Sequence, residues 1–324
     1  MKRRDFLSGL AVGSAAWPVV AQPKTARAIG ILYLGTEADA AAVTAALRRG
    51  LVERGYAEER DYHLDVRVAN NDAGQLRMLA RSLVARGVAV IVTNGTTSAR
   101  AALAESERVP IVLAGSADPV EQGLAHTLAR PGRNVTGLSI LGTELLAKRL
   151  ELLRDAIPGA KVIGALLHGA NPGVPVFRRS LEKAAAPLGL ELHVVEVRET
   201  DEIEPAFARF AALGAQALLV IEDPVFISLT DPMARLSLRH RLPILTGIRS
   251  LVNAGGFVFY GFDRLELWRR SADFVDRIFR GAMPADMPIE QPTTFTLVIN
   301  LKTAKTLGIA VPQSVLVRAD EIIE

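Results

Sequence analysis

The chain of 324 residues contains no cysteine, and aromatic residues make up only 5% of it. Without cysteine there can be no disulfide bond, thiolate metal ligand, cysteine nucleophile or lipid-modified cysteine anchor. The formal net charge is only +3, and no basic stripe with interleaved aromatic residues occurs, which argues against nucleic acid as a partner. No apolar run approaches the roughly 20 residues that a membrane-spanning helix needs.

Motifs of catalysis and of nucleotide binding are also missing. No two glycines are separated by a single residue, so the dinucleotide fingerprint is absent, and neither a phosphate-binding loop nor a G-x-S-x-G elbow occurs. The five histidines are scattered without the spacing of metal ligands. These absences predict a protein that is not an enzyme and that carries neither a metal nor a cofactor.

Residues 1–27 have the pattern of an export signal followed by a linker. A basic start precedes a short, weakly apolar run, and the small residues Val19 and Ala21 fit a cleavage site after Ala21. The adjacent Arg3 and Arg4 resemble a twin-arginine signal. The residues around them depart from the usual pattern, so the general export route stays open. We expect a periplasmic protein.

Beyond the signal, short apolar runs alternate with amphipathic helical patterns, which is typical of α/β proteins with parallel sheets. The two halves repeat the same order of segments at an offset of roughly 130 residues. IGILYL is echoed by VIGALL, VAVIVTNG by AQALLVIED, and RVPIVLAGS by RLPILTGIR. The repeat predicts two doubly wound, Rossmann-like lobes. The expected strands are 29–34, 64–68, 88–93 and 110–114, then 162–167, 190–197, 217–221 and 243–246.

Glycines and prolines mark the places where the chain is expected to cross between the lobes. They precede VTGLSI, FVFYGF and TFTLVIN, and three crossings would form a three-segment hinge that bends easily. The expected division is residues 1–27 as signal and linker, 28–137 plus 259–290 as the first lobe, and 138–258 plus 291–324 as the second lobe.

Five segments of the chain resemble a known protein family. GLVERGYAEERDYHLDVRVANND, LARPGRNVTGLS, KRLELLRDAIPGA, EQPTTFTLVINLKTAKTLGI and VLVRADEIIE are similar to ABC-transporter substrate-binding proteins of the type I periplasmic class. The subgroup includes tryptophan- and tyrosine-binding components. The resemblance spans nearly the whole chain. It implies a type I periplasmic-binding-protein fold that closes on a small solute and delivers it to an inner-membrane ABC permease.

The turns after the strands of the first lobe are candidates for ligand contacts, because ligands of open α/β sheets bind outside the carboxyl ends of the strands. Asn94, Gly95, Thr96 and Thr97 combine hydroxyls with free backbone N–H groups at a helix start, which fits a carboxylate. Helix capping is the alternative role of the two threonines.

The next turn of the first lobe contains Gly115, Ser116 and Asp118. Its hydroxyl and carboxylate fit an ammonium group, although Asp118 before a proline is equally suited to capping a helix. Tyr33 and Tyr260 are expected to supply a flat apolar wall, with a place in the core as the alternative.

The second lobe is expected to contribute residues at matching strand ends. Among them, an aspartate fits an amine and an arginine fits a second acidic group, whereas the lone histidine also suits a purely structural place. These candidates are His168, Asn171, Asp223, Ile248 and Arg249.

The sequence therefore predicts an exported solute-binding protein of an ABC uptake transporter, for an amino-acid-like solute or another small carboxylate. A periplasmic sensing subunit that docks on a receptor stays an alternative, because only the docking surface distinguishes the two. A transcriptional effector domain would need a DNA-binding helix-turn-helix before the first strand, where the sequence has its export signal instead.

Overall fold

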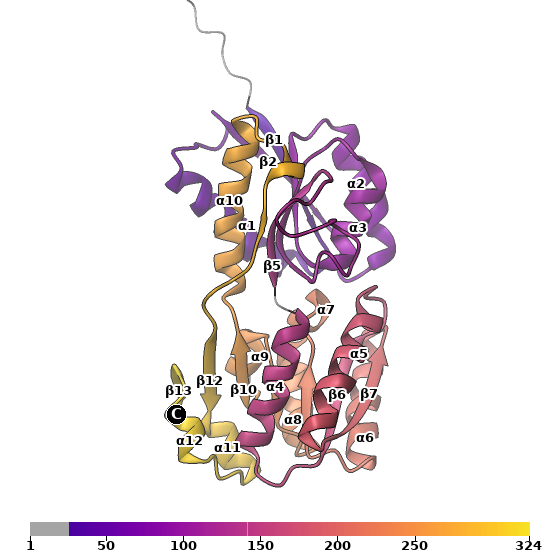
Figure 1. Ribbon diagram of the computed structural model, residues 1–324, viewed down its shortest axis with the longest axis vertical. Helices are drawn as coiled ribbons and strands as arrows, with labels where there is room; N and C mark the ends of the chain where they lie inside the picture. Colours follow the sequence, from indigo (N-terminus) through magenta and orange to yellow (C-terminus); the bar gives the residue numbers. More distant parts are fainter. Residues whose placement is uncertain (1–25, 141) are drawn as a thin grey trace, which may run out of the picture.

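The computed structural model describes residues 26–140 and 142–324, which form two α/β lobes joined end to end (Figure 1). The first lobe has a six-stranded sheet in the order β11-β5-β4-β3-β1-β2, and the second has a seven-stranded sheet in the order β13-β12-β10-β9-β8-β6-β7. The strand order β2-β1-β3-β4-β5 in the first sheet corresponds to β7-β6-β8-β9-β10 in the second. The predicted fold class and the doubly wound lobes are thus confirmed, and the matching topologies fit the repeat seen in the sequence.

The strands of the first lobe form mostly from continuous apolar runs, because both faces of the sheet are covered by helices. In β1, for example, every residue from Ile29 to Tyr33 is buried. The strands are β1 (Arg27–Tyr33), β2 (Tyr62–Val68), β3 (Val90–Thr93), β4 (Ile111–Ala117), β5 (Val135–Ile140) and β11 (Ile289–Glu290).

The second sheet is parallel except where β12 runs antiparallel to β10. Its inner strands are again continuous apolar runs. The strands are β6 (Val162–His168), β7 (Glu191–Val197), β8 (Ala217–Val220), β9 (Ile244–Thr246), β10 (Val258–Gly261), β12 (Thr296–Asn300) and β13 (Glu321–Ile323).

Helices cover both faces of each sheet. In the first lobe they are α1 (Glu37–Glu53), η1 (Ala73–Gln75), α2 (Leu76–Ala85), α3 (Gly95–Glu105), α10 (Arg264–Phe279) and η4 (Pro284–Asp286). In the second lobe they are α4 (Gly142–Ala156), α5 (Val174–Ala185), η2 (Ala186–Leu188), η3 (Thr200–Glu202), α6 (Ile203–Ala212), α7 (Pro224–Ile227), α8 (Thr230–Arg239), α9 (Arg249–Asn253), α11 (Leu301–Leu307) and α12 (Gln313–Leu316). None of the helices in the described ranges is long and apolar enough to cross a membrane.

The chain passes between the lobes three times, but two of the crossings differ from the predicted positions. β5 pairs with β4 up to Ile140, so VTGLSI is a strand of the first sheet rather than the start of the second lobe. β10 pairs with β12 through Gly261, so the return lies after that glycine rather than before residue 259. The glycine and proline clusters mark the turns that precede these strands, not the sheet that the strands join.

The N-terminal boundary also differs slightly from the prediction. β1 already begins at Arg27, where its backbone N–H donates to the carbonyl of Asp61, so Arg27 belongs to the fold and not to the linker. The predicted export signal, with Arg3, Arg4 and Ala21, lies outside the described residues.

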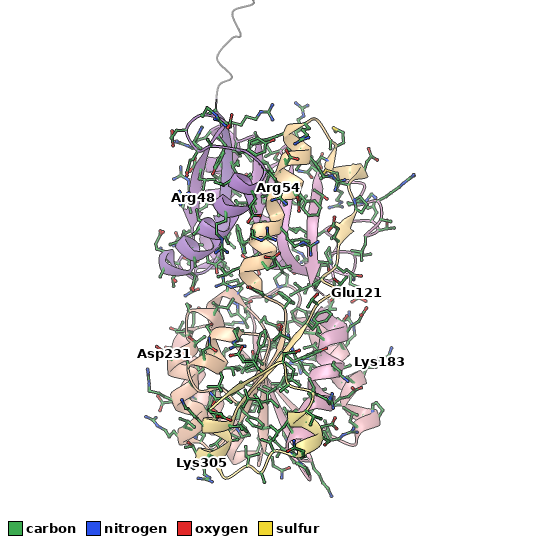
Figure 2. The ribbon with its side chains drawn as sticks, turned by 90° about the vertical axis from the view of Figure 1, so that its left-hand side faces the viewer. Arg48, Arg54, Glu121, Lys183, Asp231 and Lys305 are labelled. Atoms are coloured by element: carbon green, nitrogen blue, oxygen red, sulfur yellow. The ribbon has the colours of Figure 1, made fainter. Side chains whose placement is uncertain are left out.

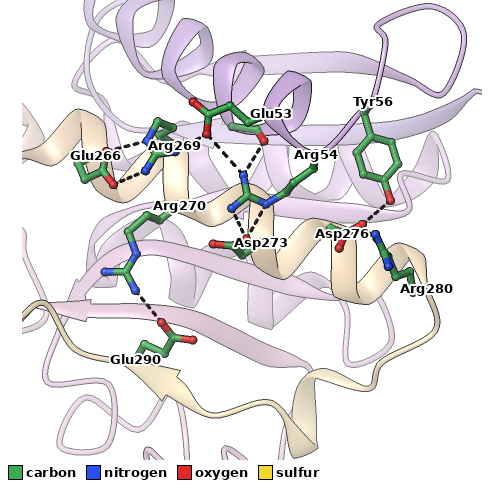
Figure 3. Close-up of polar contacts among 11 residues, drawn as sticks. Glu53, Arg54, Tyr56, Glu266, Arg269, Arg270, Asp273, Asp276, Arg280 and Glu290 are labelled. Carbon is green, nitrogen blue, oxygen red and sulfur yellow. Dashed lines mark hydrogen bonds and ion pairs between the residues drawn. The ribbon is translucent and has the colours of Figure 1, made fainter.

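Helix α10 belongs to the first lobe although it follows the last inner strand of the second (Figure 1). It packs so closely on α1 that a side chain at Gly50 would overlap the backbone carbonyl of Arg269. Ion pairs and one hydrogen bond surround this helix pair (Figure 3). They join Arg54 to Asp273, Arg269 to Glu53 and Glu266, and Tyr56 to Asp276. This packing fixes the start of α10, where the chain re-enters the first lobe.

Charged side chains project from the outer surfaces of both lobes (Figure 2). Arg48 on the first lobe is partly exposed and pairs with Glu58 at 2.7 Å. Lys183, Asp231 and Lys305 lie on the second lobe, and Glu121 lies near the junction of the two lobes (Figure 2). Charged side chains are mostly found on protein surfaces that face water.

Candidate ligand-binding site

A cavity of about 520 Å³ lies between the lobes, lined by residues at the carboxyl ends of strands from both sheets. This volume is in the range of sites for small molecules. Most of the lining is apolar, with a few polar groups in between. The predicted residues that line it are Asn94, Gly95, Thr96, Gly115, Asn171, Asp223, Ile248 and Arg249.

The N-terminus of α3 opens into this cavity. Asn94 is the N-cap residue, but its side chain makes no capping hydrogen bond. Asn94 is 8% exposed, and its Oδ1 has no hydrogen-bond partner among the residues described. The first backbone N–H groups of a helix have no partner within the helix, and they carry partial positive charge. This end of the cavity is therefore suited to an anion.

Gly95 and Thr96 complete that end of the cavity. Gly95 has a φ of +72°, which residues with a side chain rarely adopt. Thr96 is buried and lies in the first turn of the helix, and Thr97 does not line the cavity. Because the N-cap position is Asn94, neither threonine occupies the capping position that the sequence left open as an alternative.

Asp223 lies on the cavity wall in the second lobe, at the N-cap of α7. Its carboxylate accepts a hydrogen bond from the backbone N–H of Val225 at 3.0 Å and another from Nδ2 of Asn171 at 2.9 Å. The side chain is 3% exposed, so these bonds hold a carboxylate in place at the surface of the cavity. A fixed negative charge of this kind suits a cation.

His168 lies behind Asp223 and not on the wall of the main cavity, where the sequence placed it. Its Nδ1 is 3.1 Å from Oδ1 of Asp223, and its ring packs edge-on against Phe226. Burial lowers the pKa of His168, but the Asp223 carboxylate, a backbone hydrogen bond with Arg198 and the charge of Glu199 together raise that pKa above its ordinary value. The charge of this pair therefore depends on one proton.

Glu222, next to Asp223, also lines the cavity, but its charge is already compensated. Arg149 is 1% exposed, and its two terminal nitrogens bind the two oxygens of Glu222. Its Nε donates to the carbonyl of Tyr260 at 2.8 Å. Gly247 makes room for the pair, because a Cβ there would overlap both side chains. Asp223 thus carries the less compensated negative charge of the two.

Arg149 was not among the residues predicted from the sequence, although the sequence contains a signal for it. Arg149 follows Leu146 by three residues and precedes Leu153 by four, and both leucines are buried. An arginine on the apolar face of a helix points to a buried ion pair.

The two tyrosines proposed as a flat wall do not line the cavity. Tyr33 has no exposed surface and packs edge-on against Trp268 in the core of the first lobe. Burial raises the pKa of Tyr33 to about 12. Tyr260 stacks on Phe295 instead, with 6.0 Å between ring centres. The aromatic side chains that do line the cavity are Phe177, Phe259 and Phe262.

Arg264, the first residue of α10, is a cavity residue that the sequence did not single out. Its Nη1 donates to the hydroxyl of Tyr33 at 3.1 Å, and the described part of the chain offers it no carboxylate in ion-pair contact. The other cationic residue of the wall, Arg249, is paired with Glu321 at 2.5 Å. The first lobe therefore has a positive side chain as well as a helix N-terminus at the cavity.

Ser116 and Asp118 lie outside the cavity lining. Asp118 accepts hydrogen bonds from the backbone N–H and the hydroxyl of Thr143, at 3.1 and 3.2 Å, and so ties the start of α4 to the first lobe. The proposed role of Asp118 as an ammonium partner is thus corrected, because its carboxylate serves the crossing between the lobes. Ser116 has no exposed surface.

Comparison with known proteins gives one family and several relatives. Residues 31–323 match the family model described as ABC transporter substrate binding protein. The tyrosine-binding protein of Clostridioides difficile strain R20291 is 25% identical over 259 residues, which are 80% of this chain and 74% of that protein. An ABC domain from Streptococcus pneumoniae in complex with L-Trp has a TM-score of 0.85 and 26% identity, covering 92% of this chain and all of that one. A conserved domain protein from Vibrio cholerae has a TM-score of 0.87 and 26% identity over the same shares.

Proposed function

This chain belongs to the family of ABC transporter substrate binding proteins, and from that premise we propose that it binds an amino acid with an apolar, aromatic side chain. The solute would lie in the cavity between the lobes and be delivered to an inner-membrane permease. Export to the periplasm, through the signal predicted at residues 1–27, is part of this proposal.

One observation carries the proposal: the same cavity has a helix N-terminus suited to an anion in the first lobe and a carboxylate in the second. The free N-terminus of α3 at Asn94 suits the carboxylate of an amino acid, and Arg264 adds positive charge on the same lobe. Asp223 suits the ammonium group. Charge-assisted hydrogen bonds contribute about 1.5–3 kcal/mol each, so a few of them reach the free energy of micromolar binding before ordering costs.

The apolar wall supports a large side chain. Phe177 and Phe259 come from the second lobe and Phe262 from the crossing before α10, and all three line the cavity. Aromatic rings pack well against such residues because of their large apolar area and favourable edge-to-face geometry. Relatives of this chain that are named for tyrosine and solved with L-Trp support the same class of solute.

Binding is proposed to close the lobes. A solute that contacts α3 in one lobe and Asp223 in the other is bound more tightly by the closed arrangement than by an open one. It therefore shifts the population toward the closed state by the difference in its affinities.

Calorimetry tests the proposal with four probes: L-tryptophan, L-tyrosine, L-tryptophan methyl ester and indole-3-propionate. We expect at least one free amino acid to bind. Loss of the amine or of the carboxylate charge should each weaken binding by about tenfold or more, since each removes a charge-assisted contact. Failure of both amino acids to bind would refute the proposed solute class. Equal affinity for tryptophan and indole-3-propionate would refute the role of Asp223.

A further inference from the structure

His168 and Asp223 form a buried pair directly behind the wall of the cavity. The histidine is 5% exposed, and it also lines a small void beneath the main cavity together with Asp223. Asp223 lines the cavity, and Nδ1 of the His168 imidazole lies 3.1 Å from Oδ1 of its carboxylate. The electrostatic field that Asp223 presents to a solute therefore depends on whether His168 is protonated.

We propose that His168 controls the affinity for the ammonium group: neutral His168 leaves Asp223 free to bind the amine, and protonated His168 cancels that charge. This inference rests on the proposed function, because it assumes that the amine lies at Asp223. Binding of an amine-bearing solute and protonation of His168 then compete, and binding releases a proton.

The other charged groups around His168 and Asp223 do not provide this control of the affinity for the ammonium group. Glu222 is held by the buried Arg149, so that pair is neutral as a unit. Glu199 contributes a negative charge that favours the protonated histidine. The backbone hydrogen bond with Arg198 also favours the protonated histidine. Across the cleft, Tyr33 keeps its proton near neutral pH, because burial raises its pKa to about 12.

The direction of the effect follows from thermodynamic linkage. A cation at Asp223 disfavours a second positive charge next to the same carboxylate, so it lowers the proton affinity of His168. Conversely, acidification protonates His168 and weakens the binding of the amine. The carboxylate end at α3 keeps its partial positive charge throughout this range. Low pH therefore shifts the preference of the cavity from amino acids toward acids that lack the amine.

The experiment measures the affinities for L-tryptophan and indole-3-propionate by calorimetry between pH 5.5 and 8.5, a range in which both probes keep most of their own charge. Three proteins are compared: the unmodified protein, His168→Gln, and His193→Gln. The last is a matched control, because His193 also lies 3.1 Å from a carboxylate, that of Glu191, but away from the cavity. Repeating the titrations in buffers of different ionisation enthalpy measures the protons released.

For the unmodified protein and for His193→Gln, the affinity for tryptophan should fall by up to about tenfold per pH unit on the acid side of the His168 transition. Proton release should accompany binding near that transition. The affinity for indole-3-propionate should not fall on acidification. In His168→Gln, the fall for tryptophan and the proton release should both disappear. The same pH dependence in His168→Gln as in the unmodified protein would overturn the inference.

A second readout needs no solute and separates this inference from the proposed function. Histidine NMR of the solute-free protein gives the pKa of His168 directly, and Asp223→Asn should lower it. If neither probe binds any of the proteins, the proposed function fails. An unchanged His168 pKa in Asp223→Asn would overturn the inference whatever the binding data show.

Discussion

Asn71 in the first lobe donates a hydrogen bond to Ser228 in the second lobe, with 3.0 Å between Nδ2 and Oγ. Asn71 lies in the turn after β2, and Ser228 follows α7, the short helix whose N-cap is Asp223. Gln122 of the first lobe also approaches Gly173 of the second, where a Cβ would come within 2.8 Å of its Nε2. None of these four residues lines the cavity, so the contacts join the two lobes directly.

Breaking the Asn71–Ser228 hydrogen bond should weaken solute binding, although neither residue lines the cavity. Asn71→Gly is the suitable change, because Asn71 has a φ of +67° that glycine adopts without strain. A lost hydrogen bond costs about 1 kcal/mol, so we expect roughly fivefold weaker binding of tryptophan, mainly through faster dissociation. Stopped-flow fluorescence measures both rates.

Ser228→Ala provides the control for this prediction. If the two side chains act through their mutual bond, the double variant should bind about as well as either single variant. Additive losses would show that each residue acts separately, and unchanged dissociation rates in both single variants would contradict the prediction.

Gly247 should be intolerant of any side chain, because it adjoins the buried Arg149–Glu222 pair. In Gly247→Ala, the new methyl group would overlap Glu222 Oε1 and Arg149 Nη2 and force them apart. Leaving a buried charge without its partner typically costs about 3–5 kcal/mol. We expect a loss of that size in the free energy of unfolding, measured by denaturant titration.

The matched control is Gly74→Ala, an exposed glycine where a Cβ would meet only the carboxylate of Asp72, at 3.1 Å. That side chain can move into solvent, so the control should unfold close to the unmodified protein. If Gly247→Ala were as stable as the control, the arginine–glutamate pair would not be held by this glycine.

Much of the fold could be predicted because the determining patterns are local. Runs such as IGIL and VAVIV are continuously apolar, which is typical of strands buried on both faces. Their repetition in the second half then indicated two similar lobes. The crossings were placed a few residues off, because nothing in VTGLSI itself tells which sheet supplies its hydrogen-bond partners. Pairing of β5 with β4 is a property of the assembled sheet.

The residues of the candidate site could likewise be predicted only in part. Asn94 and Asp223 could be found because they directly follow strands, and strand ends meet at the cleft. Tyr33 and Asp118 also follow or end strands, but one turns into the core and the other binds Thr143 across the crossing. The direction of a side chain at a strand end depends on the turn that follows. Sequence position alone therefore identifies candidates without separating cavity residues from their neighbours.

The stability of the solute-free protein should depend on pH through His168. Its pKa is raised in the folded state, so the protonated histidine stabilises the fold. That contribution is fully present below the ordinary histidine pKa of about 6.5 and is lost as the pH rises through the higher folded value.

Thermal unfolding of the unmodified protein and of His168→Gln should therefore differ most near pH 5.5, and the difference should shrink toward pH 8.5. His193→Gln, whose pair lies in the same lobe, serves as the control for general effects of losing a histidine. A difference that grows with pH would contradict the assignment of the raised pKa to His168.

Thr96 and Thr97 are adjacent in α3 but differ in their position relative to the cavity. Thr96 is 2% exposed and lines the cavity, and Thr97 is less buried and does not line it. Thr96→Val keeps the shape of the side chain and removes its hydroxyl, so it should weaken binding of a free amino acid by about 1–3 kcal/mol. Thr97→Val makes the same chemical change in the same helical turn, and it should leave the affinity unchanged. The methyl ester, which lacks the charge, should lose less affinity than the free acid when Thr96 is replaced. Calorimetry with tryptophan and its methyl ester gives all these values. Equal losses in the two variants, or an equal loss for acid and ester, would show that the α3 N-terminus does not hold the carboxylate.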